Sequence, residues 1–302
     1  MFYDLTQPLV IGISSRALFD LEEENHIYDT RGLEAYTEYQ VANEKNILRP
    51  GAGFELVKAF LRLNEARSGR HLVEVIFVSR NSPDTSLRIF NSIEHYGLGI
   101  TRAVLSGGAP VAPYLTSFKT DLFLSAYSPD VQEAVDVGVA AGMLLSGGHH
   151  TEQGRPVDQI RIAFDGDAVI FSDEAEQIYQ REGIEAFAEH EKRRAMDPLP
   201  EGPFAKLLKT ISLVQNRFPE DRMPIRTALV TSRSAPAHER VIRTLMAWNV
   251  RIDEAFFLGG VSKSEVLRAF GANIFFDDQS VHTGPASKLV PSARVPYIQR
   301  QQ

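Results

Sequence analysis

The stretch "RIAFDGDAVIFSDE" (Arg161–Glu174) places two carboxylates, Asp165 and Asp167, directly behind an apolar run. Side chains at positions i and i+2 of a strand lie on one face, and Gly166 suits a strand end where the backbone turns or is closely approached. Two acids at the end of a buried strand have three explanations: metal binding, nucleophilic catalysis or a plain turn. Other features of the sequence distinguish these three explanations.

Short β-rich runs alternate with helical patterns on both sides of this stretch. Helical periodicity is clear over Pro83–Tyr96 and Pro236–Trp248, for example. Such alternation is typical of an α/β fold in which helices flank parallel strands. The predicted strands are Leu9–Ser14, Val73–Ser79, Arg102–Gly107, Thr120–Ala126, Ile160–Asp165, Thr227–Ser232, Glu254–Gly260 and Ala272–Asp278.

The composition is that of an ordinary globular protein and excludes several classes of function. The 302 residues carry a net charge of −7 and include no cysteine, which rules out disulfides and thiolate metal sites. No long basic block is present, so a nucleic-acid polymer is a poor partner. No apolar run is long enough to span a membrane and no signal peptide is apparent, so we expect a cytoplasmic protein without a membrane partner.

The sequence contains an internal repeat. Ser14–Phe60 aligns without gaps on Asp165–Ile211, and Val78–Ala126 aligns on Val230–Asp278. The order of strands and helices repeats as well, which indicates two homologous α/β halves. We therefore predict a first half over residues 1–150 and a second over residues 151–302, joined near the Gly-rich polar segment Ser146–Asp158.

Charged groups distinguish the two halves. Asp165 aligns with Ser14 and Lys263 aligns with Val111, while Asp277 aligns with Ser125. The scaffold pattern is thus repeated without these charges, so the charges are not needed for folding. This contrast predicts a working site in the second half and a degenerate, structural or regulatory first half.

The polar groups of the second half share a position: each follows a predicted strand at its C-terminal end, the edge where open α/β sheets bind ligands. They are Asp165, Asp167, Thr231, Lys263, Asp277 and Asp278. Several carboxylates at one edge repel each other unless a cation joins them, and such oxygen ligands suit Mg²⁺ shared with a phosphate. A lysine and a hydroxyl can hold the other phosphate oxygens. One aspartate can then attack phosphorus while the other transfers protons.

In this order the motifs resemble those of the haloacid dehalogenase superfamily of phosphohydrolases, and more narrowly the cytosolic type I 5′-nucleotidases. The resemblance extends through nearly the whole chain. It implies a Rossmannoid parallel sheet with a small helical cap, and Mg²⁺-dependent hydrolysis of nucleoside 5′-monophosphates such as AMP. The segments that carry it are "ISSRALFDLEEENHIY" (Ile13–Tyr28), "FDGDAVIFSDEAE" (Phe164–Glu176), "FAEHEKRRAMDPLPEGP" (Phe187–Pro203), "VTSRS" (Val230–Ser234) and "IFFDDQ" (Ile274–Gln279).

The resemblance also implies a role for each residue. Asp165 would be the nucleophile that forms an aspartyl-phosphate, and Asp167 the general acid/base that also offers its backbone carbonyl to the metal. Lys263 would join nucleophile and phosphate. Asp277 would bind Mg²⁺, with Asp278 a further ligand or a partner of one. The phosphate-binding residues would be Thr231 and Ser232, together with Lys263.

A helical insertion at about residues 174–224 is the expected cap. Phe187 and His190 are candidates to contact the base, although alignment of Phe187 with Tyr36 favours packing. Arg233 could reach a phosphate or form a surface ion pair. The run "EHEKRR" (Glu189–Arg194) reads as a solvated helix face.

Several alternatives stay open at this level. The substrate could be another small phosphate ester, and the protein could instead be a non-enzymatic nucleotide sensor. The first half could complete the site, bind an effector such as ADP or ATP, or form a homo-oligomer. Base and sugar preference is not encoded in any motif that we recognise.

Overall fold

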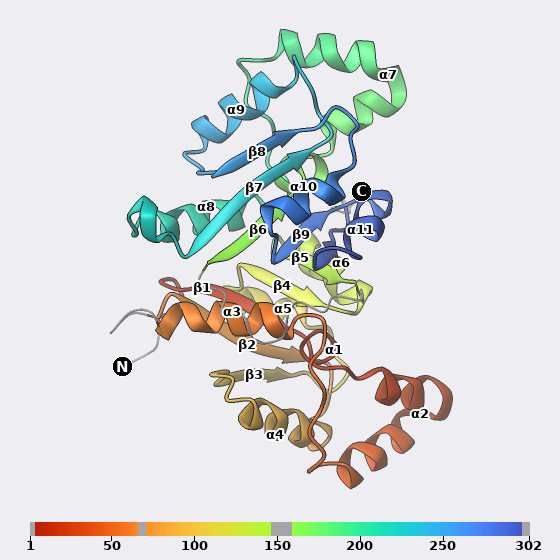
Figure 1. Cartoon of the computed structure of the whole chain (residues 1–302). Coiled ribbons are helices and arrows are strands. Elements are labelled where there is room, and N and C mark those ends of the chain that lie inside the picture. Colours follow the sequence, from red (N-terminus) through yellow and green to blue (C-terminus); the bar gives the residue numbers. More distant parts are fainter. Residues whose placement is uncertain (1–3, 66–70, 146–158, 298–302) are drawn as a thin grey trace. The chain divides into compact units, whose positions relative to one another are not determined.

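The computed structural model describes residues 4–65, 71–145 and 159–297. The chain forms two compact units, Met1–Val139 and Ala140–Gln302. In each unit helices flank a set of mostly parallel strands (Figure 1). The predicted α/β class is confirmed, and all eight predicted strands are present.

Unit 1 (Met1–Val139) has its strands in the order β3-β2-β1-β4, all parallel. The first strand lies in the interior between β2 and β4, and its five residues are all buried. The strands are β1 (Leu9–Ile13), β2 (Val73–Ser79), β3 (Arg102–Leu105) and β4 (Leu122–Ser125). The helices are α1 (Ser15–Leu18), α2 (Glu22–Ala42), α3 (Phe54–Glu65), η1 (Asp84–Ser86), α4 (Leu87–His95), α5 (Ala112–Ser117) and α6 (Ser128–Asp136).

Unit 2 (Ala140–Gln302) has the order β5-β10-β9-β6-β7-β8. All neighbouring pairs are parallel except β5 with β10. The strands are β5 (Ala140–Leu144), β6 (Ile160–Phe164), β7 (Ile225–Thr231), β8 (Glu254–Phe257), β9 (Ile274–Asp277) and β10 (Ser292–Arg294). The helical elements are η2 (Gly166–Ile170), α7 (Glu174–Arg193), α8 (Ala205–Gln215), η3 (Glu220–Arg222), α9 (His238–Ala247), α10 (Lys263–Phe270) and α11 (Ser280–Ala286).

The boundary between the units lies earlier than the sequence suggested. The sequence predicted a division after residue 150, whereas the compact units divide between Val139 and Ala140. The reason is that β5 pairs with β10 and so belongs to unit 2. Neither strand was predicted, because "AAGML" and "SAR" lack the β-branched and aromatic residues of a typical strand. The predicted joining segment Ser146–Asp158 lies outside the described residues.

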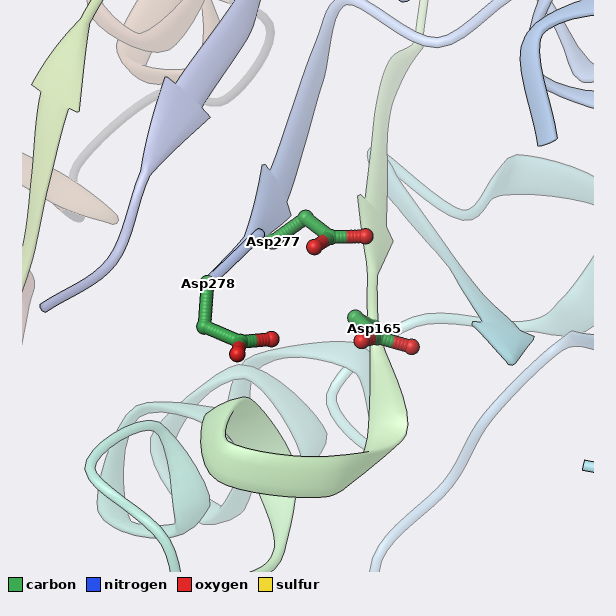
Figure 2. A group of neighbouring side chains, drawn as sticks. All are labelled: Asp165, Asp277 and Asp278. Atoms are coloured by element: carbon green, nitrogen blue, oxygen red, sulfur yellow. The ribbon is translucent and has the colours of Figure 1, made fainter. Parts of the chain in front are cut away.

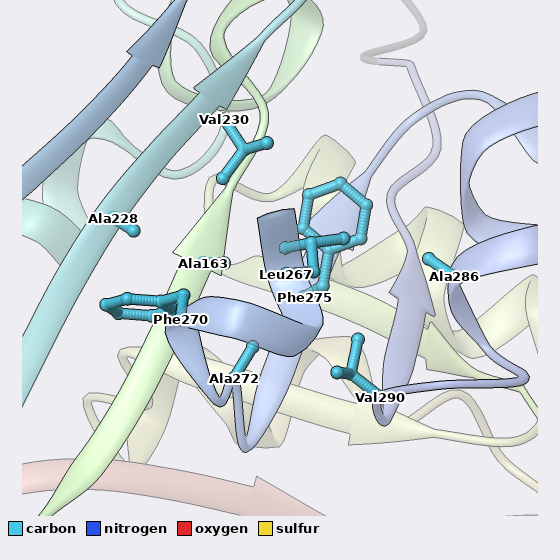
Figure 3. Close-up of a cluster of buried hydrophobic side chains, with 9 residues drawn as sticks. All are labelled: Ala163, Ala228, Val230, Leu267, Phe270, Ala272, Phe275, Ala286 and Val290. Carbon is cyan, nitrogen blue, oxygen red and sulfur yellow. The ribbon is translucent and has the colours of Figure 1, made fainter. Parts of the chain in front are cut away.

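Apolar side chains cover both faces of the unit 2 strands. On one face, Leu267 and Phe270 of α10 pack with Phe275 of β9, and Figure 3 shows this cluster. On the other face, Phe204, just before α8, lies 6.1 Å from Phe164 and 4.8 Å from Phe276 between ring centroids. Burial on both faces holds β6 and β9 in register, and their ends carry the aspartates discussed below.

The predicted cap is smaller than expected. Helix α8 buries most of its length, including Leu208 and Ile211, so it belongs to the core and not to a cap. Helix α7 differs, because only Ala175, Phe187 and Glu191 of its twenty residues are buried, and in Figure 1 it extends away from β7 and β8. Of the predicted insertion, only the region of α7 therefore remains a candidate for the cap.

Among residues 4–65, 71–145 and 159–297, no helix combines the length and the apolar character needed to cross a bilayer.

Candidate active site

Three aspartates meet at the C-terminal edge of the unit 2 strands. Asp165 follows β6, and Asp277 and Asp278 end and follow β9. Because β6 and β9 are parallel neighbours, with Phe164 paired to Phe276, the residues after them emerge side by side. One carboxylate oxygen from each aspartate lies within 4.8 Å of the others (Figure 2). The structure thus brings together three of the four acids singled out in the sequence.

Lys263 completes this group. It is the first residue of α10, where the side chain of Ser262 accepts a hydrogen bond from the Ser264 N–H. Its Nζ lies 2.8 Å from Asp165 Oδ1 and 2.7 Å from Asp277 Oδ2, and the residue is 2% exposed. A solvated loop lysine is therefore excluded, because this ammonium is buried between two carboxylates.

The electrostatics of this group leave negative charge in excess. Burial opposes the charged form of Lys263, but Asp165 and Asp277 outweigh burial and raise the pKa of this ammonium. Burial raises the pKa of Asp165 and of Asp277, while Lys263 opposes the rise. Burial and the neighbouring Asp165 carboxylate raise the pKa of Asp278 to about 7. One lysine does not neutralise three buried acids, so the group favours an additional cation.

Asp278 has an oxygen available for such a cation. Its Oδ2 accepts a hydrogen bond of 2.6 Å from the Tyr297 hydroxyl, while its Oδ1 is buried and has no hydrogen-bond partner within the described residues. Asp277 Oδ1 accepts a hydrogen bond from the Gln279 N–H at 2.8 Å, which fixes that side chain. A buried acceptor beside two further carboxylates is the oxygen-rich environment that Mg²⁺ prefers. The residues present therefore fit a magnesium ion.

Thr231 ends β7 at the same edge and is buried. Its Oγ1 accepts a hydrogen bond of 3.2 Å from the Arg233 N–H, and this contact leaves the hydroxyl proton available to donate. A Cβ at position 166 would lie 3.4 Å from Thr231 Oγ1, an ordinary van der Waals contact, so space alone does not require the glycine there. Ser232, also predicted to bind phosphate, is exposed beside it.

Asp167 does not join the three aspartates. Both of its carboxylate oxygens are held by the Arg233 guanidinium, with Oδ2 2.8 Å from Nε and Oδ1 2.7 Å from Nη2. Arg233 also contacts Glu191 of α7, and these two carboxylates raise the pKa of the guanidinium against the opposing effect of burial. Of the two sequence interpretations of Arg233, the surface ion pair is wrong, because the side chain is 3% exposed.

The predicted base-contacting residues lie in helix α7. Phe187 packs against the Arg233 guanidinium at 5.3 Å and meets Tyr179 edge-on at 6.3 Å. These contacts match the packing role that the alignment with Tyr36 favours. His190 is partly exposed and its Nδ1 lies 3.3 Å from Glu191 Oε1. Recognition of a base by either residue stays a prediction.

The sequence missed two residues at this site, Glu191 and Tyr297. Glu191 was read as part of a solvated helix face, but it is fully buried between Arg233 and Arg240. Glu191 aligns with Gln40, which is buried as well, but only the structure reveals this burial. Tyr297 stands far from any motif, and no pattern in the sequence points to its contact with Asp278.

Comparison with known proteins places this chain in a family. A family model described as 5′-nucleotidase matches residues 1–302. Cytosolic 5′-nucleotidase 1B of Homo sapiens is 38% identical over 291 residues, covering 93% of this chain and 47% of the human protein. The chain thus spans about half the length of this curated relative.

Similarity to solved structures adds nothing to this assignment. A structure described as a universal stress protein from Pseudomonas aeruginosa UCBPP-PA14 covers 97% of this chain and 94% of its own, at 7% identity and a TM-score of 0.35. That likeness is too weak to bear on fold or function. The sequence resemblance is confirmed by the family model and by the human relative together: this chain belongs to the 5′-nucleotidase family.

Proposed function

We propose that this protein is a cytosolic, Mg²⁺-dependent 5′-nucleotidase that hydrolyses nucleoside 5′-monophosphates, AMP among them, to nucleoside and phosphate. The observation that carries the proposal is the buried group of Asp165, Lys263, Asp277 and Asp278 at one strand edge, in a chain of the 5′-nucleotidase family. The cytosolic assignment follows the name of the human relative. We further infer a fold of the haloacid dehalogenase type for unit 2.

In this proposal Asp165 is the nucleophile. One of its carboxylate oxygens forms a bond to phosphorus as the bond from phosphorus to the 5′ oxygen breaks. The electron pair stays on the 5′ oxygen, which takes a proton from Asp167 and leaves as the nucleoside hydroxyl. A water molecule then gives a proton to Asp167 and attacks phosphorus, which restores the Asp165 carboxylate and releases phosphate.

Three further residues would hold the phosphate and the nucleophile. Lys263 already contacts Asp165 at 2.8 Å and Asp277 at 2.7 Å, so its ammonium fixes the attacking carboxylate and offsets charge on the transferred group. The Thr231 hydroxyl would donate to a phosphate oxygen, with Ser232 nearby.

Asp165, Asp277 and Asp278 would hold Mg²⁺, joined by the backbone carbonyl of Asp167. When bound, the ion would neutralise charge on the phosphate and on the three acids. The unpartnered Oδ1 of Asp278 supports this set, because a buried acceptor without a partner is costly to maintain.

We also infer that the two units arose by duplication, with unit 1 lacking the chemistry. Gly32 in α2 and Gly183 in α7 break their helices with φ of +82° and +84° at aligned positions. The Leu48 N–H donates to Ser92 Oγ at 3.0 Å, as the Leu199 N–H donates to Thr244 Oγ1 at 2.9 Å. Gly107, Gly108, Gly259 and Gly260 repeat the same pair of positive φ angles.

Two alternatives are kept as outcomes of the test. The site chemistry equally serves another small phosphate ester, and a nucleotide sensor would bind without turnover. The contribution of unit 1, whether to effector binding or to a homo-oligomer, is left to experiment.

The test is phosphate release from AMP, IMP, dAMP and a sugar phosphate, each with Mg²⁺ and with EDTA. Metal-dependent release that is fastest with a 5′-nucleotide supports the proposal. Faster release from the sugar phosphate would indicate that the substrate is another small phosphate ester. Nucleotide binding without phosphate release under Mg²⁺ would support the sensor.

A further inference from the structure

A chain of four charges runs from the acid/base Asp167 through Arg233 and Glu191 to Arg240, and the last three are buried. Arg233 holds both oxygens of Asp167, at 2.8 Å and 2.7 Å, and its remaining Nη1 contacts Glu191. The Phe187 ring lies under the same guanidinium at 5.3 Å. Arg233 is therefore fixed from two sides by side chains of α7, at positions 187 and 191.

Glu191 is itself anchored at its other oxygen. Arg240 of α9 donates to Glu191 Oε1 at 2.7 Å, and its Nε donates to the Asp197 carbonyl at 2.9 Å. Neither side chain of this pair is exposed. The Asp167 side chain is 18% exposed and stands at the open end of the chain of charges. Asp167 is thus the member that has room to move.

Comparison with unit 1 shows which of these four charges serve the structure alone. Arg88, which aligns with Arg240, is also buried, and its Nε donates to the Asn46 carbonyl at 2.8 Å. The position of Asn46 aligns with that of Asp197. Arg88 pairs with Glu24 at 2.6 Å and contacts Gln40 at 3.3 Å. An arginine at this position therefore fastens the helix in both units.

Arg233 has no such counterpart. The aligned residue is Asn81, whose side chain donates to the Tyr36 hydroxyl at 2.9 Å. Asp167 aligns with Arg16, so unit 1 lacks both members of the Asp167–Arg233 pair. A guanidinium at position 233 is not needed to fasten the helix, and it occurs in the unit that carries the acids.

We propose that Arg233 is a positioning residue for Asp167, held in place by Glu191 so that helix α7 sets where the acid/base begins its proton transfer. The inference rests on the proposed function. In the observed pair each carboxylate oxygen of Asp167 accepts a hydrogen bond from Arg233, and Asp167 would turn one oxygen away from Arg233 to protonate the 5′ oxygen. Arg233 defines the position from which that short movement starts and to which Asp167 returns.

The test compares two esters that differ in their need for an acid. The 5′ oxygen of AMP is a poor leaving group and needs a proton, whereas the nitrophenolate of p-nitrophenyl phosphate leaves without one. In Arg233→Asn we expect kcat/KM for AMP to fall about 10- to 100-fold, because misplacing a catalytic group costs this much. The value for p-nitrophenyl phosphate should change by less than about threefold, since its departure does not use Asp167. Arg233→Lys, which keeps one charge, should recover part of the loss.

The matched control is Arg194→Gln. Arg194, just after α7, pairs with Glu174 and Asp197 at 3.0 Å and 3.1 Å, and within the described part of the chain it forms no ion pair with Asp167. It should leave the ratio of the two kcat/KM values unchanged. Equal losses for both esters in Arg233→Asn and Arg233→Lys would overturn the inference, as would unchanged or faster AMP hydrolysis. A wild-type protein inactive on both esters would instead overturn the proposed function, and the inference with it.

Discussion

Aligned strands of the two units end in different residues, an uncharged one in unit 1 and an acid in unit 2. The pair Ser125 and Asp277 shows what this difference means. In unit 1 the Ser125 hydroxyl accepts a hydrogen bond from the Tyr127 N–H at 3.1 Å. In unit 2 one oxygen of the aligned Asp277 accepts from the Gln279 N–H at 2.8 Å. The turn after the strand therefore needs only one acceptor. The second oxygen of Asp277 is surplus to the fold, and it contacts Lys263.

Other polar groups match in both units and serve the scaffold. Asp121 accepts a hydrogen bond from the Val10 N–H at 2.9 Å, and the aligned Asn273 accepts from the Arg161 N–H at 2.7 Å. An acid and an amide act alike here, so this position needs an acceptor and not a charge. The comparison thus separates groups that hold the fold from groups that are free for chemistry.

We expect the largest loss of turnover from a substitution in the first aligned pair, Ser14 and Asp165. Asp165→Asn removes the nucleophile but keeps its shape, and we expect turnover to fall by about 10⁴-fold or more. Ser14→Ala is the matched control, because the Ser14 hydroxyl has no partner within the described residues. Phosphate release measures both variants. Near-normal turnover in Asp165→Asn would end the proposed mechanism.

Lys263 and Val111 form the second pair. Lys263→Met leaves two buried carboxylates without their cation, and we expect it to destabilise the protein by about 3–5 kcal/mol. Urea unfolding in EDTA measures this loss. The triple variant Asp165→Ser, Lys263→Val and Asp277→Ser carries the unit 1 residues at these three positions and should recover most of the stability. A triple variant as unstable as Lys263→Met would contradict the scaffold interpretation.

Thr231 and Ser79 form a third pair with a smaller expected effect. Each hydroxyl accepts the N–H two residues on, from Arg233 at 3.2 Å and from Asn81 at 3.1 Å. Thr231→Ser keeps this hydroxyl and should change kcat/KM by less than about threefold. Thr231→Val removes the hydroxyl and should lower kcat/KM about 10- to 100-fold, as loss of one donor to a transferring group does. Equal kcat/KM values for Thr231→Ser and Thr231→Val would show that the Thr231 hydroxyl does not bind the phosphate.

The smallest effect concerns pH and Asp278, whose pKa is raised by burial to about 7. A carboxyl with a raised folded-state pKa contributes stability that is fully present below its ordinary value of 3.8 and is lost as the pH rises to about 7. The melting temperature in EDTA should therefore fall as the pH rises across this window. Asp278→Asn should flatten the fall. Mg²⁺ should raise the melting temperature more at higher pH, since its ligands must be deprotonated; a stabilisation independent of pH would argue against this site.

Sequence alone located the strands and the residues at their ends, because both depend on local patterns. The run ending at Asp165 and the run ending at Asp277 are apolar and β-rich, so parallel pairing placed their acids together. The short strand β10 has no such pattern, and its position depends on pairing with β9 and β5. The unit boundary was misplaced for the same reason.

Burial of charge was the other property that local patterns could not supply. Glu191 sits in a run of charged residues typical of a solvated face, yet its contacts with Arg233 and Arg240 come from segments distant in sequence. Tyr297 reaches Asp278 in the same way. A chemical motif names the residues that react, whereas the residues that position them are found only from tertiary contacts.

In the proposed mechanism, chemistry occurs at Asp165 in unit 2 and has no counterpart at the aligned Ser14 in unit 1. The most direct test is to quench the enzyme during turnover of AMP with Mg²⁺, reduce it with borohydride and map the product by mass spectrometry. Borohydride converts an aspartyl-phosphate to homoserine. We expect homoserine at position 165, formed only when both AMP and Mg²⁺ are present. Full turnover of AMP without any modification at position 165 would contradict it.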